Sequence, residues 1–381
     1  MKIIVLVNIT SRLPYLSGAP RRIKELIEGM HKKGWKVITF NVHHASIRAT
    51  FPRFLASFIE ITLSFFRLMK GRVVPHVIIF FSPINGLIAL FYRFFFQNTK
   101  VIYCDRGDPI EGIRLLPIKN RITCFLRLVE LLTISFLERA ICLKSDKIIF
   151  NSRWRLRKVE KLVGKRLTNA QVIPNNANPS WVRKWLSEIT EFSTIDIDMS
   201  WNNKKVIGFV GNLYEVGNGL DILLTAFKII SERIPESVLV IVGDGPDKRK
   251  LKQKAGKMNL DNRVCFTGGV PNPFLYMTKF DVFVHPARHH SCPNAILESL
   301  ICNIPVIGSR AGGIPEILKY DELLFELGNA KELADKIVHF FTDAIYREKI
   351  KKLTSQLKDE YLFDWQEAMC SAIKDTVINA K

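Results

Sequence analysis

The chain has 381 residues, of which 48% are hydrophobic, 24% charged and 10% aromatic. This composition provides a large core and excludes a disordered, collagen-like or coiled-coil protein, and the length suffices for two domains of roughly 100–200 residues each. The formal net charge of +20 resides in residues 1–175, which hold 30 Lys and Arg against 10 Asp and Glu, whereas residues 176–381 hold 26 of each. We therefore expect a basic first domain that faces an anionic partner, which leaves nucleic acid, acidic lipid and a phosphorylated substrate open.

The start of the chain predicts a buried strand. Met1-Lys2 leads directly into a short apolar run, Ile3 to Val7, and a polar loop follows, which does not match a signal peptide. The seven cysteines form no C-x-x-C pair and show no metal-ligand spacing, so reduced thiols in a cytoplasmic protein are expected. These cysteines are Cys104, Cys124, Cys142, Cys265, Cys292, Cys302 and Cys370.

Strand-like and helix-like segments alternate through the first half of the chain, a pattern typical of a parallel sheet with crossover helices. The first predicted helix has Ile23, Leu26, Ile27 and Met30 on one face. It follows a loop in which Gly18 allows close backbone approach to a ligand at a strand end. The polar stretch 186–204 is the predicted linker. We expect strands at 2–8, 36–41, 77–81, 100–103, 147–150 and 171–173.

Three segments of the first half bear on membrane binding. Residues 73–92 lack formal charge, but prolines and a glycine interrupt them, which favours a strand and a helix over a membrane span. Residues 54–69 are apolar almost all round, and predict either a buried helix or one that lies in a membrane interface. Residues 153–166 hold seven basic side chains, which is typical of a solvated helix face or of a surface for anionic lipid.

The alternation restarts in the second half, and two doubly wound α/β domains are therefore expected. Such domains usually hold their ligand in the cleft between them. The predicted strands are 205–210, 238–242, 264–267, 281–284 and 304–307, and the predicted helices are about 219–233, 247–258, 293–302 and 313–318.

Glycine-rich turns follow two of these strands, at 208–213 and 241–246, and His285 ends a third. Turns of this kind at the carboxyl ends of parallel strands predict a nucleotide site. Further on, the loop before residue 293 opens a helix, whose free amides and dipole can hold an anion. Glu298, one turn inside that helix, could accept hydrogen bonds from a ribose diol. The candidate donor-binding residues from these segments are Gly211, Gly243, Asp244, Ser291, Cys292 and Glu298.

The order of these motifs resembles the family 4 retaining glycosyltransferases, which have the two-domain GT-B fold. The resemblance implies an acceptor domain at 1–185, a donor domain at 200–362 and a C-terminal helix, 363–381, that crosses back to the first domain. It also implies a UDP- or GDP-linked sugar donor, no metal ion, and a lipid-linked or cell-surface glycan acceptor. The motifs that carry it are the Gly18 loop, 145–152, 172–178, 209–211, 242–246, 312–316 and 363–365.

The sequence departs from the family at positions that are usually charged. An arginine and a lysine that clamp the donor diphosphate correspond to Asn212 and Asn218, and the first of two paired glutamates corresponds to His290. Either Arg288, Arg310 or a protonated His290 supplies the missing positive charge, or catalysis is weak or absent. Because His289 and Arg288 are its neighbours, His290 is expected to have a lowered pKa.

In the first domain, residues 104–109 follow a predicted strand where the family often has a histidine beside the transferred sugar. Arg106 is the candidate replacement, and the candidate catalytic residues are Arg106, Asp108 and His290. The Asp105-x-x-Asp108 pair also invites a metal site, but two carboxylates around an arginine more often form a local salt bridge, so no metal is expected.

The sequence thus predicts a retaining glycosyltransferase, peripheral on the inner face of the membrane. Two alternatives remain open: a catalytically weak or inactive homologue that acts as a partner or scaffold, and a nucleotide-sugar epimerase on the same fold. Nucleic acid is not an expected partner, because no zinc finger or RNA-binding aromatic motif accompanies the basic stretch.

Overall fold

The computed structural model describes residues 4–9, 18–41, 66, 74–115, 121–176, 187, 201 and 203–378. The chain divides into two units, one of residues 1–174 with 364–381 and one of residues 175–363. The predicted boundary at 185 and most of the predicted linker lie outside the described residues. The candidate interface helix at 54–69 also lies outside them, except for Phe66.

The first unit is built on a six-stranded sheet whose paired strands are all parallel, in the order β2-β1-β3-β4-β5-β6. Apolar runs produce these strands, and all four side chains of β3 are buried. The strands are β1 (Ile4–Ile9), β2 (Lys36–Asn41), β3 (Val77–Phe80), β4 (Lys100–Asp105), β5 (Lys147–Phe150) and β6 (Ala170–Val172). Each observed strand coincides with a predicted one within about two residues.

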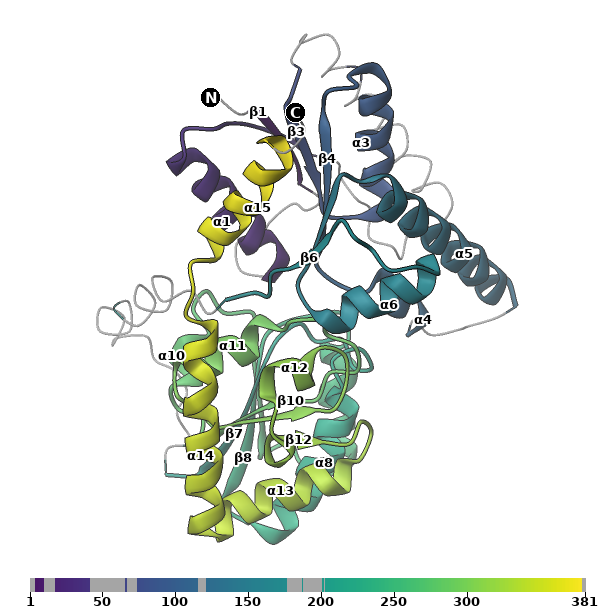
Figure 1. The fold of residues 1–381 in the computed structure, drawn as a ribbon. Helices are drawn as coiled ribbons and strands as arrows, with labels where there is room; N and C mark the ends of the chain where they lie inside the picture. The colour runs from purple at the N-terminus through teal and green to yellow at the C-terminus, as the bar shows by residue number, and fades with distance from the viewer. Residues whose placement is uncertain are drawn as a thin grey trace. The chain divides into compact units, whose positions relative to one another are not determined.

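Helices cover both faces of this sheet. Figure 1 shows α1 (Gly18–Lys32) and α15 (Trp365–Ile378) on one side of it, and α3 (Pro83–Phe95) and α5 (Arg121–Lys144) on the other. From 74 to 92 the described chain thus holds a strand and a helix, as predicted. None of the helices in the described part of the chain combines the length and hydropathy of a membrane-spanning segment.

The basic stretch at 153–166 forms α6 (Arg153–Val163). The helix begins where the Ser152 hydroxyl accepts a hydrogen bond from the Arg155 amide, and it ends at Gly164, whose φ of 81° is accessible to glycine. Val159 and Val163 face the core, and so does Arg155. The remaining basic side chains of α6 form its outer face, apart from the half-buried Lys158.

The C-terminal helix α15 packs on α1 of the first unit, which confirms the predicted return of this helix to the first domain (Figure 1). The Gln366 amide donates to the carbonyl of Glu25 at 2.7 Å. Lys33 forms an ion pair with Glu367 at 2.5 Å. The Trp365 ring, which is buried, lies 4.8 Å from the guanidinium carbon of Arg106.

The second unit has a six-stranded sheet in the order β12-β11-β10-β7-β8-β9, and its paired strands are also parallel. The strands are β7 (Lys205–Val210), β8 (Ser237–Val242), β9 (Val264–Gly268), β10 (Val282–His285), β11 (Val306–Ser309) and β12 (Leu324–Phe325). The helices and 3-10 turns are α8 (Leu220–Arg233), α9 (Lys248–Lys257), α10 (Phe274–Met277), α11 (Asn294–Ile301), α12 (Ile314–Leu318), η1 (Asp321–Leu323), α13 (Ala330–Thr342), α14 (Ala344–Lys358) and η2 (Asp359–Tyr361). Two parallel-sheet, Rossmann-like units confirm the predicted fold class.

Candidate functional site

Three loops of the second unit meet where β7, β10 and β11 end. The first is 211–219, the second 286–293 and the third 310–313. The Arg288 amide donates to the carbonyl of Gly217 at 3.1 Å, and the Gly313 amide donates to the carbonyl of His290 at 2.9 Å. Because parallel sheets bind ligands at the carboxyl ends of their strands, this junction is the candidate site.

Packing between loops explains why several residues here are glycine. Gly243 has a φ of +137°, and a Cβ atom on it would lie 2.0 Å from the carbonyl oxygen of Gly211. A Cβ atom on Gly245 would lie 2.6 Å from the backbone nitrogen of Leu213. The sequence pattern predicts a nucleotide site at glycine turns of this kind. In the structure these glycines let the loop after β8 pack on the loop after β7.

Gly219 and Gly217 provide a matched pair of substitutions. Gly219 has a φ of +66°, and a Cβ atom on it would lie 1.9 Å from the carbonyl oxygen of Pro286, whereas one on Gly217 would lie 3.4 Å from the nearest atom, in His289. We expect Gly219→Ala to destabilise the second unit by roughly 2–4 kcal/mol, since it adds both backbone strain and a clash. Gly217→Ala should change the stability by less than about 0.5 kcal/mol. Urea unfolding of both variants tests this, and equal stability would show that the loops do not depend on this contact.

The two asparagines at the usually charged positions belong to one loop. Asn212 is exposed, and its backbone carbonyl accepts a hydrogen bond from the side-chain amide of Asn218. Asn218 is buried. Asn218 therefore holds the loop in shape, while Asn212 presents a neutral side chain to solvent.

The candidate replacement cations are already paired. Arg288 forms two hydrogen bonds with the Asp221 carboxylate, each of 2.7 Å. Arg310 pairs with Asp321 at 2.8 Å and Glu326 at 2.6 Å. Both guanidinium groups are thus bound to carboxylates in the described structure, and the replacement of the family's arginine or lysine by one of them stays a prediction.

Asp244 is also paired at the edge of the site. It is exposed and forms an ion pair with Lys248 at 2.9 Å. The hydrogen bond from Lys248 lowers the pKa of Asp244, and one from the Gly245 amide adds to the effect. In the described structure its carboxylate thus fixes the turn after β8.

His290 contacts a second histidine, His285, and the sequence did not predict this contact. The Nδ1 atom of His290 is 2.9 Å from Nε2 of His285, which is the last residue of β10. Burial, and next the neighbouring His289, lowers the pKa of His290 to about 4. The predicted direction is confirmed, and the alternative of a protonated His290 at neutral pH is wrong.

The hydrogen bond fixes the tautomers of the pair. Nδ1 of His285 is buried and has no hydrogen-bond partner. An unpaired acceptor is tolerated better than an unpaired N–H group, so we assign the His285 proton to Nε2, from which it is donated to His290. His290 then carries its own proton on Nε2 and acts as a neutral donor.

The same pair predicts a pH dependence of stability. Burial, and next His290, lowers the pKa of His285 well below its ordinary value, as burial also does for His290. The unfolded chain takes up protons near pH 6.5 while the folded chain does not, so the second unit should lose stability as the pH falls from about 6.5 to about 4. We expect His285→Phe with His290→Gln to flatten this slope in urea unfolding series. An unchanged slope would assign the effect to other groups.

The start of α11 is anchored from within the second unit. The side-chain amide of Asn175 donates to the carbonyl of Cys292 and to the side-chain oxygen of Asn294, both at 2.9 Å. Ser291 and Cys292 are buried beside it. Sequence reasoning gave Asn175 no role, although it lies in the family motif at 172–178. No side chain caps the helix at Pro293.

Glu298 is a buried carboxylate in the second turn of α11, with 9% of its surface exposed. The predicted donor-site residues of the second unit lie in the three loops, in the turn after β8 and in α11. Gly18, Arg106 and Asp108 are in the first unit instead.

Structural contacts occupy the candidates of the first unit. Gly18 is the first residue of α1. The Arg106 guanidinium contacts Trp365 and lies 3.8 Å from the sulfur of Met369, both on α15. Asp108 caps α4 (Pro109–Arg114) by accepting a hydrogen bond from the Glu111 amide. A catalytic role for Arg106 or Asp108 stays a prediction.

A buried charge cluster replaces the salt bridge predicted around Arg106. Arg155, which is 1% exposed, binds both oxygens of Asp105, at 3.1 and 3.0 Å through Nε, and contacts Glu138. Lys158 pairs with Asp108 at 2.5 Å. Burial raises the pKa of Glu138 to about 8, against the opposing effect of Arg155. The predicted partner, Arg106, is thus wrong; the carboxylates pair with Arg155 and Lys158 of α6.

No group of His, Cys, Asp or Glu side chains suited to a metal ion occurs among the residues that the structure describes.

Residues 204–343 match the family model described as glycosyl transferases group 1. An uncharacterized glycosyltransferase of Methanocaldococcus jannaschii is 26% identical over 275 residues, which are 71% of this chain and 59% of that protein. The phosphatidylinositol N-acetylglucosaminyltransferase gpi3 subunit of Schizosaccharomyces pombe is 28% identical over 41% of this chain and 34% of its own length. The match thus spans less than two thirds of either relative.

Solved structures resemble the whole chain. The sucrose-phosphate synthase of Thermosynechococcus elongatus has a TM-score of 0.77 at 16% identity and covers 100% of both chains. The HepE protein of Anabaena, in complex with UDP-glucose, has a TM-score of 0.67 at 16% identity and covers 98% of each chain. The chain therefore has the GT-B fold, and its residues 204–343 match the glycosyl transferases group 1 family.

Proposed function

We propose that the protein is a glycosyltransferase that takes a sugar from a nucleotide sugar and retains the anomeric configuration. The observation that carries the proposal is the junction of three loops at the strand ends of a glycosyl transferases group 1 match, with Glu298 buried one turn inside α11. The donor is UDP- or GDP-linked. The UDP-glucose complex of the HepE protein, which shares the fold, supports a donor of this chemistry.

The proposed donor site relies on neutral groups. The backbone amides at the start of α11 and the helix dipole hold the diphosphate, since Arg288 is paired with Asp221. Asn212 and the Nε2–H group of His290 add hydrogen bonds without adding charge. Glu298 accepts hydrogen bonds from the ribose diol. The departing diphosphate takes the proton of the acceptor, so no protein base is required, and no metal ion takes part.

The proposed acceptor is a lipid-linked or cell-surface glycan, at the inner face of the membrane. The excess positive charge of residues 1–175 supports an anionic surface as partner of the first unit. The relative from Schizosaccharomyces pombe, named for transfer to phosphatidylinositol, supports a lipid acceptor. Nucleic acid is not a proposed partner.

A transfer assay tests the proposal. The full-length protein is incubated with a panel of UDP- and GDP-sugars and lipid acceptors in vesicles, and the anomeric configuration of any product is read by NMR. We expect one donor to yield a glycosylated lipid with the configuration of that donor. Nucleotide binding without transfer would favour the scaffold alternative, and conversion of the donor without acceptor would favour the epimerase.

A further inference from the structure

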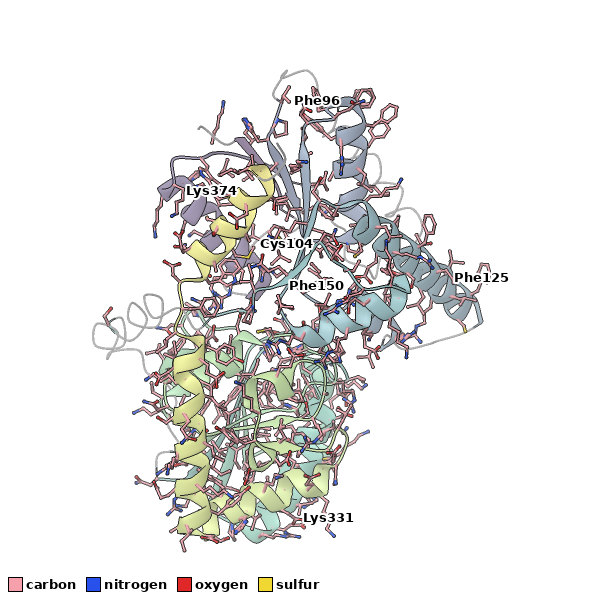
Figure 2. The ribbon with its side chains drawn as sticks, viewed as in Figure 1. Phe96, Cys104, Phe125, Phe150, Lys331 and Lys374 are labelled. Carbon is pink, nitrogen blue, oxygen red and sulfur yellow. The ribbon has the colours of Figure 1, made fainter. Side chains whose placement is uncertain are left out.

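More than half of the large hydrophobic side chains that are exposed in the described structure lie on two helices of the first unit, α3 and α5. The two helices pack against each other. On α3 the exposed side chains are Leu87, Phe91, Phe94 and Phe95, and on α5 they are Phe125, Leu126, Leu128, Val129, Leu132, Phe136 and Leu143. We call this set the apolar face. Figure 2 shows Phe125 pointing away from the body of the unit.

Helix α5 is apolar on both of its sides. Ile134, Leu137 and Ile141 are buried, while Phe125, with 66% of its surface exposed, and Phe136, with 71%, lie outside. A helix that is hydrophobic all round is normally surrounded by protein or lipid, and contiguous exposed apolar patches mark interaction sites. The exposed apolar side of α5 therefore indicates a binding partner with an apolar interior.

The exposed charges around the apolar face all have one sign, whereas the acidic Glu130 of α5 and Glu160 of α6 are half-buried. Helix α6 packs against α5, and every exposed charged side chain among the described ones of α3, α5 and α6 is basic. These side chains are Arg139 and Lys144 on α5, and Arg153, Arg157 and Lys161 on α6. Phenylalanine and leucine beside lysine and arginine form the pattern of an element that lies in a membrane interface, with its cations at the lipid headgroups.

We infer that the α3–α5 apolar face, with the basic outer side of α6, docks the first unit on an anionic lipid bilayer. The inference rests on the proposed function in one respect: a lipid-linked acceptor is the reason for the protein to bind a membrane. Sequence patterns had directed attention to residues 54–69 and 153–166, and α5 was not among them. The bilayer is favoured over a protein partner because the single sign of the exposed charges matches a layer of anionic headgroups.

Vesicle sedimentation with the full-length protein tests the inference. Vesicles of phosphatidylcholine with 30% phosphatidylglycerol (roughly the anionic content of a membrane leaflet) are compared with vesicles of phosphatidylcholine alone. We expect binding to the anionic vesicles that weakens as salt is added. Binding to neither kind of vesicle, or equal binding to both, would overturn the inference.

Two triple variants assign the surface. Phe125→Ser, Leu132→Ser and Phe136→Ser together should weaken binding at least about a hundredfold, because the three side chains no longer enter the acyl region. Arg153→Gln, Arg157→Gln and Lys161→Gln should weaken it about a hundredfold, at about fivefold for each cation. The control combines Lys279→Gln, Lys331→Gln and Lys374→Gln, which are exposed on other elements. A control that weakens binding as much as the test variants would contradict the assignment.

A fluorescent label gives a second readout that leaves the side chains of the apolar face unchanged. Cys124, at the start of α5, is exposed, whereas the other six cysteines are buried or half-buried. An environment-sensitive dye on Cys124 should shift to the blue on anionic vesicles, and a dye on Lys331→Cys in a protein with Cys124→Ser should not. A dye on Cys124 that stays in water would overturn the inference. If the Ser variants instead convert a dimer into a monomer in sedimentation velocity, the apolar face belongs to a second copy and the bilayer is wrong.

The outcomes separate this inference from the proposed function, because vesicle binding requires neither donor nor acceptor. Binding without any transfer would leave the docking face standing and contradict the transferase. Transfer to a soluble acceptor without vesicle binding would support the transferase and contradict the docking face.

Discussion

Replacing Arg155 with methionine is expected to destabilise the first unit by about 3–5 kcal/mol. Arg155 is the buried cation between Asp105 and Glu138, both of which are 0% exposed. Methionine leaves the carboxylate of Asp105 in the core with its charge uncompensated, and that charge cannot reach water. Urea unfolding followed by hydrogen exchange in β4 and β5 would show the loss in the first unit.

Arg157 on the same helix provides the control. It is exposed, so Arg157→Met should change the stability by less than about 0.5 kcal/mol. Arg155→Lys should lie between the two, since lysine keeps the charge but cannot form the paired hydrogen bonds of a guanidinium. If Arg155→Met is as stable as the parent protein, the cluster does not hold the first unit together.

Glu298→Gln is expected to weaken donor binding by roughly 10–150-fold. Hydrogen bonds from two ribose hydroxyls to a carboxylate are stronger than those to a neutral amide, and a buried carboxylate has little water to compete with them. Glutamine has the same size, so the stability should change little. Isothermal titration with the nucleotide sugar that proves active, or with UDP and GDP, measures the effect.

Glu236→Gln is the matched control for this experiment, because Glu236 is exposed in the same unit. It should bind the nucleotide as tightly as the parent protein does. An unchanged affinity in Glu298→Gln would mean that the ribose lies elsewhere, and the proposed donor site would then lose its only anionic anchor.

The fold could be predicted largely because strands of parallel sheets are buried on both faces. The limits of an uninterrupted apolar run, such as the one that forms β8, therefore give the limits of the strand. Helix α5 was missed because it is apolar on both sides and shows little contrast between its faces. Strand β12 was missed because two residues carry no periodicity.

The sequence could predict which residues belong to the candidate site, but not which of their side chains bind one another. The turn glycines and Glu298 follow from local spacing, whereas the contact of Arg288 with Asp221 joins residues 67 positions apart. That contact turns an expected free cation into a structural ion pair. The contact of His285 with His290 spans a loop whose path the sequence does not specify.

The ion pairs of the structure separate two kinds of positive charge, one in each unit. The first unit keeps exposed cations on α6 and on α5, beside exposed aromatic side chains. In the second unit, by contrast, Arg288 and Arg310 are both bound to carboxylates. The exposed cations thus support the proposed docking of the first unit on an anionic surface, whereas the proposed donor site depends on amides and neutral side chains.

A crystal structure of the protein with UDP or GDP tests the proposed donor site most directly. We predict that the diphosphate lies against the backbone amides at the start of α11, beside Asn212 and His290, and that the ribose diol lies against Glu298. A nucleotide bound only in the first unit, or a diphosphate held by Arg288 after its ion pair with Asp221 has opened, would contradict a donor site built from neutral groups.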